Sequence, residues 1–103
     1  MNKIERDGKV AVLVSPGYGA GWSTWNYEHR ETLCMDADIV QAILDGDRTK
    51  AVEIAKQKCG DFYDGGADGL IVEWVPKGTG FLITEHDGHE TLRIISGVAP
   101  LVA

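Results

Sequence analysis

The chain has 103 residues and a formal net charge of -6. This length suits one domain, 1–103. Hydrophobic and charged fractions of 44% and 25% lie near the globular average and exclude a disordered chain. The acidity argues against nucleic acid and anionic membranes as partners, because both are bound by clustered Lys and Arg.

Cysteine usage indicates the compartment. A small secreted domain usually carries more cysteines than the two found here, Cys34 and Cys59. No basic-then-apolar leader opens the chain, and no apolar run reaches the length of a membrane span. We therefore expect a cytoplasmic protein with reduced thiols. We also expect a homo-oligomer, because a small domain forms a deep pocket most easily between subunits.

The first half of the chain predicts a strand, a loop and two helices. Lys9–Val14 is rich in β-branched residues, which is typical of a strand buried on both faces. Ser15–Asn26 is rich in Gly, Ser and Thr and predicts a loop, called here the Gly/aromatic loop. Helical spacing of apolar residues and flanking cap residues predict two short helices. They are Asp36–Leu44, capped by Asp36 or Asp38, and Arg48–Cys59, capped by Asp47.

The second half predicts three strands, Leu70–Val75, Phe81–His86 and His89–Ile95. Asp87-Gly88 between the last two is the strongest hairpin signal in the chain. A two-residue turn pairs His86 with His89, and alternation then places Phe81, Ile83, Leu92 and Ile94 on one apolar face. The order predicts an α+β fold with an N-terminal strand, the Gly/aromatic loop, two short helices and a three-stranded antiparallel meander.

The Gly/aromatic loop carries more chemistry than a scaffold needs. Alternating glycines let the backbone approach a ligand closely, and successive N–H groups can form a concave anion site. Aromatic faces stack on flat rings. The combination predicts a site for a small nucleotide-like or anionic ligand, without a cofactor or a metal. Its residues are Gly17, Tyr18, Gly19, Gly21, Trp22, Ser23, Thr24, Trp25, Asn26, His29 and Arg30.

Two interpretations of the loop remain open. In the first, Trp22 and Trp25 face a ligand. In the second, both indoles fill the core and the glycines only allow a tight path. The loop matches neither the dinucleotide-binding fingerprint, whose third glycine is missing, nor a Walker loop.

Weaker candidates lie around the hairpin turn. His86 and His89 face each other there, but Glu85 and Glu90 alternate to the opposite face, so the four do not converge on a metal. The two facing glutamates are expected to destabilise the hairpin mildly unless a cation lies near them.

Other polar groups point to no reaction. His29 and Glu31 are an acid–base pair that nothing in the spacing requires, and the acidic stretch after residue 60 lacks the closing Glu of a calcium loop. No nucleophile with a base and an orienting group is visible, so we expect no enzyme.

Val10–Asn26 (VAVLVSPGYGAGWSTWN) and Gly65–Gly80 (GGADGLIVEWVPKGTG) resemble a family of short uncharacterised proteins from bacteriophages and prophages. The resemblance implies a phage accessory protein that counters host defence, either by sequestering a nucleotide signal or by blocking a host protein. The first route fits a non-catalytic ligand binder built on the Gly/aromatic loop. The alternative is an acidic inhibitor that binds a host protein through its charged surface or a sheet edge.

Overall fold

The computed structural model describes residues 1–103 and confirms the α+β class and the N-terminal strand. Three helices accompany two antiparallel sheets of three strands each. The strands are β1 (Glu5–Arg6), β2 (Lys9–Val14), β3 (Ile71–Pro76), β4 (Gly80–His86), β5 (His89–Ile95) and β6 (Leu101–Val102). The helices are α1 (Arg30–Met35), α2 (Ala37–Leu44) and α3 (Arg48–Cys59), with short 3-10 turns η1 (Ser23–Trp25), η2 (Tyr27–His29) and η3 (Ala67–Gly69).

The two predicted helices begin at their predicted caps. The Asp36 carboxylate accepts hydrogen bonds from the N–H groups of Asp38 and Ile39, at 3.2 and 3.3 Å, and so caps α2. Asp47 caps α3 in the same way. Lys58, near the end of α3, reaches the Asp36 carboxylate at 2.9 Å. One carboxylate therefore starts α2 and also holds α3 beside it.

One predicted pairing is wrong, because β3 does not continue a meander with β4 and β5. It pairs with β2 along its whole length, from Lys9 opposite Pro76 to Val14 opposite Ile71, so the sheets have the orders β1-β2-β3 and β5-β4-β6. The reason lies in β2. A buried strand needs partners for the backbone groups on both edges: β1 pairs along part of one edge, and β3 covers the other.

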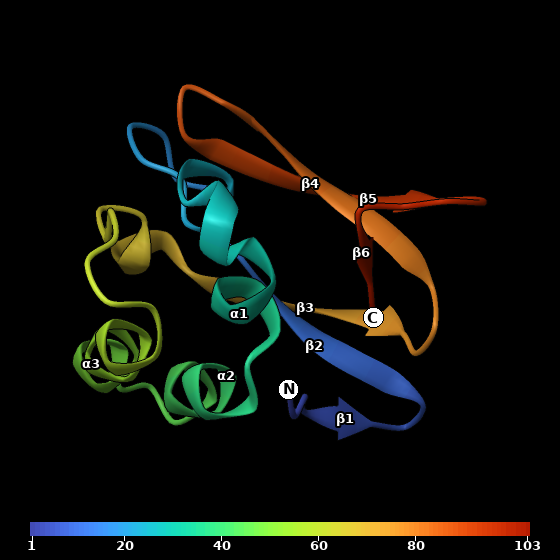
Figure 1. Ribbon diagram of the computed structural model, residues 1–103, viewed down its shortest axis with the longest axis horizontal. Coiled ribbons are helices and arrows are strands. Elements are labelled where there is room, and N and C mark those ends of the chain that lie inside the picture. Colours follow the sequence, from blue (N-terminus) through green and yellow to red (C-terminus); the bar gives the residue numbers. More distant parts are fainter.

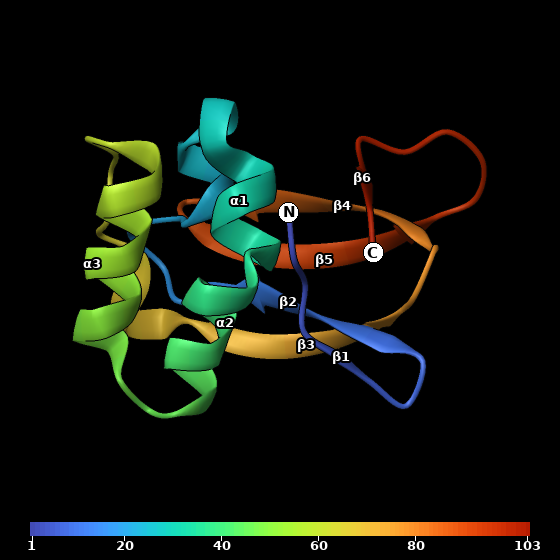
Figure 2. The same ribbon diagram turned by 60° about the horizontal axis from the view of Figure 1, so that its bottom comes forward.

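The β2 strand separates two hydrophobic cores. Ala11 and Leu13 point towards α2 and α3, whereas Val10 and Val12 alternate to the other face and pack with Phe81 of the second sheet. This explains why β2 is apolar at every buried position. Figures 1 and 2 show α2 and α3 side by side, α1 beside them, and the β4–β5 hairpin crossing over the first sheet.

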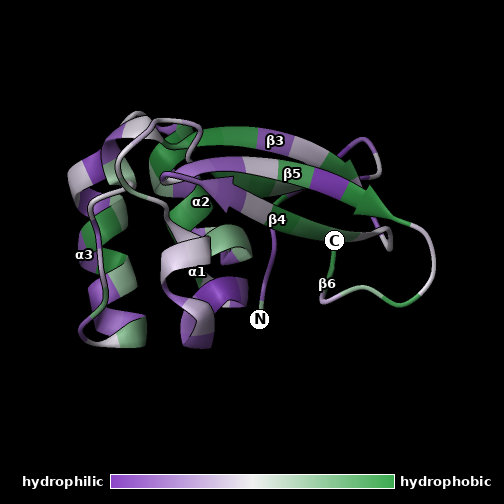
Figure 3. Cartoon of the chain, turned by 90° about the horizontal axis from the view of Figure 1, so that it is seen from above, coloured by the Kyte–Doolittle hydropathy of each residue, from purple (hydrophilic) through white to green (hydrophobic).

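The predicted hairpin register is confirmed, including the pairs His86 with His89 and Glu85 with Glu90. Asp87 and Gly88 both have positive φ, 51° and 85°, as a type I′ turn requires. Figure 3 shows that β4 is hydrophobic where it meets β6 and hydrophilic towards this turn. No helix combines the length and the apolar character that are needed to cross a membrane.

Candidate functional site

The Gly/aromatic loop folds against the tip of the β4–β5 hairpin. The Gly19 N–H donates to the Asp87 carbonyl at 2.6 Å, and the Glu90 N–H donates to the Ser15 carbonyl at 2.9 Å. His89 Nδ1 donates to the carbonyl of Pro16. The first half of the loop is thus fixed to the hairpin at Ser15, Pro16 and Gly19.

A buried carboxylate organises the middle of the loop. Glu90 is 2% exposed and accepts hydrogen bonds from the backbone N–H groups of Ser15, Trp22 and Thr24, at 2.9, 2.8 and 3.1 Å. The Thr24 hydroxyl adds a fourth bond at 2.6 Å. The loop does form a concave anion site, but the anion that occupies it is a side chain of the protein. No local sequence pattern indicates this role of Glu90.

The expectation that both indoles face a ligand is wrong for Trp22. Its side chain is fully buried, donates from Nε1 to the Leu33 carbonyl at 2.7 Å, and meets the ring of Phe62 edge to face. A buried indole needs such a partner for its N–H. Of the two open interpretations, core packing therefore holds for Trp22.

Trp25, in contrast, is 40% exposed. Its indole N–H donates to the Glu85 carboxylate at 3.3 Å, and its ring lies 5.1 Å from that of Tyr63. Asn26 fixes this region by donating to the carbonyls of Trp22 and Tyr63, both at 2.8 Å. The second half of the loop is therefore both ordered and accessible.

The glycines of the loop have three different environments. Gly19 has a positive φ of 99°. Gly21 is packed so closely against Thr24 and Trp25 that a Cβ atom would overlap them. Gly17 lines a separate hollow of about 350 Å³ with Tyr18 and Asp68. The Asp68 carboxylate also lines that hollow and disfavours an anion there.

A cavity of about 250 Å³ lies between the second half of the loop and β4. We call it the β4 cavity. Its wall on the β4 side is largely apolar, and its opposite wall carries hydroxyl, phenol and guanidinium groups. The lining residues are Ser23, Thr24, Tyr27, Arg30, Leu82, Ile83, Glu85, Pro100 and Leu101. It therefore contains Ser23, Thr24 and Arg30 of the predicted site.

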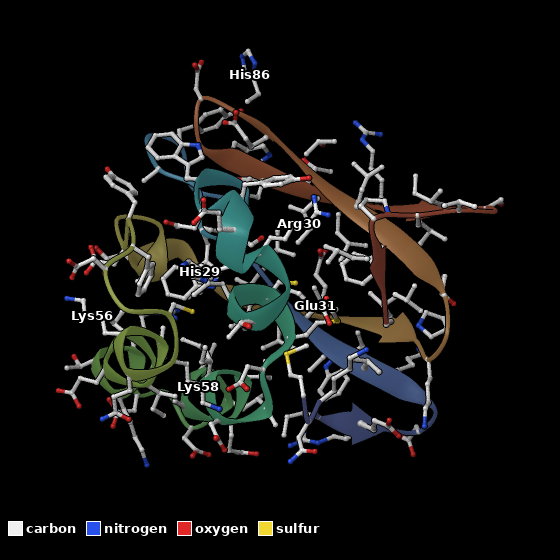
Figure 4. The ribbon with its side chains drawn as sticks, in the orientation of Figure 1. His29, Arg30, Glu31, Lys56, Lys58 and His86 are labelled. Carbon is white, nitrogen blue, oxygen red and sulfur yellow. The ribbon has the colours of Figure 1, made fainter.

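Two residues of opposite charge, Arg30 and Glu85, line this cavity. Arg30 stacks over the ring of Tyr27 at 4.3 Å and takes part in none of the ion pairs of the structure. Figure 4 shows Arg30 directed from α1 towards β4. On β4, the Gly88 N–H, and secondly the Trp25 indole, lower the pKa of Glu85 by hydrogen bonding to its charged form.

The other predicted residues do not join the β4 cavity. His29 lines a separate hollow with Trp25, Asn26 and Asp61. The two hairpin histidines also diverge, since the His86 side chain is exposed whereas His89 stacks on Tyr18. Nowhere do three His, Cys, Asp or Glu side chains gather as a metal site would require.

Comparison with known proteins adds no relative. No protein-family model, no curated protein and no solved structure matches this chain.

Proposed function

We propose that this protein is a non-catalytic binder of a small, anionic, nucleotide-like molecule, which it holds in the β4 cavity. One observation carries the proposal. An arginine without an ion-pair partner faces an apolar strand wall across a hollow of about 250 Å³. A partly desolvated guanidinium needs an anion, and its planar fork suits a phosphate group.

The remaining groups of the cavity match the other parts of a nucleotide. The Glu85 carboxylate can accept hydrogen bonds from ribose hydroxyls, as acidic residues do in dinucleotide-binding folds. Repulsion between Glu85 and an anionic ligand is reduced, because the Gly88 and Trp25 N–H groups already bind its carboxylate. Leu82, Ile83 and Pro100 offer an apolar surface to a base.

The volume limits the size of the ligand. Cavities for drug-sized molecules span about 300–1,000 Å³, so about 250 Å³ suits one ring system with one charged group. A larger signal molecule would need a second copy of the chain to close over it. For such a larger molecule, the proposal includes a homo-oligomer. If the chain is phage-encoded, the protein would act in the cytoplasm of a host cell, where it sequesters a defence signal.

Calorimetry with linear and cyclic nucleotides tests this function, with inorganic phosphate and pyrophosphate as simple anions. We expect at least one nucleotide to bind more tightly than about 1 mM, or roughly -4 kcal/mol. Arg30→Gln should weaken binding by about tenfold or more, because it removes a charge-assisted hydrogen bond. Arg48→Gln, at the start of α3 and outside the cavity, makes the same change of charge and should not.

Two results would contradict the proposal. If no nucleotide binds more tightly than about 1 mM, the β4 cavity is not a nucleotide site. A change in the mass of the bound ligand during incubation would show catalysis and remove the non-catalytic part.

A second candidate function is an acidic inhibitor of a host protein. It is favoured by the stretch from Asp61 to Asp68, where Asp61 and Asp68 are exposed and take part in no ion pair. Asp64 between them is paired with Lys56 at 3.4 Å. This function predicts a salt-sensitive complex in host lysate. Charge reversal at the three aspartates should weaken that complex, and unchanged binding would exclude this surface.

A further inference from the structure

The second sheet has an edge that its last strand leaves open. β6 is two residues long and pairs with Gly80 and Phe81 only. Pro100, just before β6, has no N–H to extend the pairing. Beyond Phe81, the side of β4 that faces away from β5 therefore has no strand beside it, although β4 continues to His86.

The register identifies which backbone groups are open. His86 and His89 flank a two-residue turn, so they form a hydrogen-bonded pair. Even-numbered residues of β4 then direct their N–H and C=O groups to β5, and odd-numbered residues direct theirs to the other edge. The bond from the Ala103 N–H to the Thr79 carbonyl at 3.0 Å follows the same parity. Phe81 is covered by Leu101, which leaves Ile83 and Glu85.

The two residues that carry these open groups belong to the lining of the β4 cavity. Ile83 and Glu85 both line it, and neither makes a backbone hydrogen bond outside the strand ladders. Their N–H and C=O groups alternate along one edge, so donor lies next to acceptor. Unpaired N–H and C=O groups at a strand edge are available to an added partner. A ligand in the cavity can supply them.

We propose that this main-chain edge reads the base of the ligand. The inference rests on the function proposed above and adds the part of the molecule that Ile83 and Glu85 bind. The edge suits a flat group with a hydrogen-bond donor beside an acceptor, which the amino-bearing nucleobases carry. The phosphate belongs at Arg30 instead, because the carbonyl oxygens of the edge repel an anion.

The length of the edge favours a base over a peptide. An added strand usually spans about five to six residues. Here β6 ends the free edge on one side and the Asp87-Gly88 turn ends it on the other, so only Ile83 and Glu85 offer groups. One flat ring fits that span.

Amide hydrogen exchange, followed by NMR on the unmodified protein, tests the proposal with an internal control. The Leu82 and Thr84 amides bind β5 and should exchange slowly at all times. The Ile83 and Glu85 amides should exchange quickly in the free protein. A nucleotide selected by calorimetry should slow at least one of them by about tenfold or more, whereas ribose 5-phosphate, which has no base, should not.

The other outcomes separate this inference from the proposed function. If a nucleotide binds by calorimetry but leaves both amides fast, base reading is overturned and the binding function stands. Slow exchange of the Ile83 and Glu85 amides in the free protein also overturns base reading. If that slow exchange becomes faster on dilution of the protein, a second copy of the chain covers the edge. If calorimetry detects no binding, the proposed function fails first and base reading fails with it.

Discussion

The carboxylate of Glu90 lies 2.8 Å from the backbone nitrogen of Trp22, although the two residues are 68 positions apart in the chain. The contact joins the hairpin to the residue whose indole fills the first core. Thr24, two residues later, is bound by the same oxygen and lines the β4 cavity. The accessible half of the Gly/aromatic loop is therefore positioned by a buried acid that does not itself line the β4 cavity.

Removing this acid should be costly. Glu90→Ala leaves the N–H groups of Ser15, Trp22 and Thr24 without their partner, and buried unsatisfied donors cost about 1–3 kcal/mol each. Partial rearrangement of the loop limits the loss, so we expect about 3 kcal/mol in the free energy of unfolding. Chemical denaturation measures it.

Glu85→Ala is the matched control, because it removes the facing glutamate of the same pair, whose carboxylate is exposed to solvent. The control should change the unfolding free energy far less. Equal effects of the two substitutions would show that Glu90 has no special role in holding the loop.

The pair Glu85 and Glu90 also shows where sequence reasoning stops. Alternation within the hairpin predicted that they face each other, and the structure confirms it. Their like charges were expected to destabilise the hairpin mildly unless a cation lay near them. Relief comes instead from main-chain N–H groups of a loop more than sixty residues away. Local patterns predict hairpins and caps, but they do not show which distant backbone will meet a side chain.

The same limit explains the pairing of β3. Its sequence predicted the strand correctly, and proximity in the chain favoured β4 as its neighbour. The choice of β2 depends on the open edge of a strand far earlier in the sequence. For the candidate site, residue types predicted Ser23, Thr24 and Arg30, whereas the facing wall from β4 depends on tertiary packing and was not predicted.

The close approach of the loop to the hairpin turn gives a second prediction. Gly88 and Gly97 have nearly equal positive φ, 85° and 87°. A Cβ atom on Gly88 would overlap the backbone of Ala20, whereas one on Gly97 would meet nothing within 4 Å. Gly97→Ala should thus cost only the left-handed strain, about 1 kcal/mol. Gly88→Ala should cost clearly more, since it also separates the loop from the hairpin.

Denaturation of the two glycine variants under the same conditions gives this difference. Similar losses of stability would mean that the loop does not pack on the turn as described.

Acid should weaken the hairpin tip through Glu85. The pKa of this carboxyl is lowered below 4.5, first by the Gly88 N–H and then by the Trp25 indole. A group whose folded pKa is depressed stabilises the protein above its unfolded pKa, and this contribution is lost as the pH falls through the folded value. Glu85→Gln should therefore reduce the acid-induced fall of the melting temperature below about pH 4.5. Parallel melting curves of variant and wild type down to about pH 2 would contradict this.

The two helix caps differ in a way that mutation can resolve. Asp47→Ala removes one capping bond of α3 and should cost about 1 kcal/mol. Asp36→Ala removes the cap of α2 and also the ion pair with Lys58, so it should cost more. With Lys58→Met as the common background, the part of the extra loss that comes from the ion pair should disappear, and only the second capping bond of Asp36 should still separate the two variants. An unchanged difference between the two caps would assign the excess to burial of Asp36 instead.

The two thiols should differ in reactivity although neither is in a disulfide. Burial, with a smaller contribution from Glu31, raises the pKa of Cys34 to about 12. At about pH 8, roughly one such thiol in ten thousand is the reactive thiolate. The pKa of Cys59 is raised less, also by burial, and its side chain is partly accessible. A disulfide reagent such as Ellman's should modify Cys59 slowly in the native protein and Cys34 only on unfolding.

In Cys59→Ser, the native protein should therefore show no reaction until denaturant is added. Prompt release of one equivalent from that variant would mean that α1 opens in the native state and exposes the core between β2 and the second sheet, where Cys34 is packed.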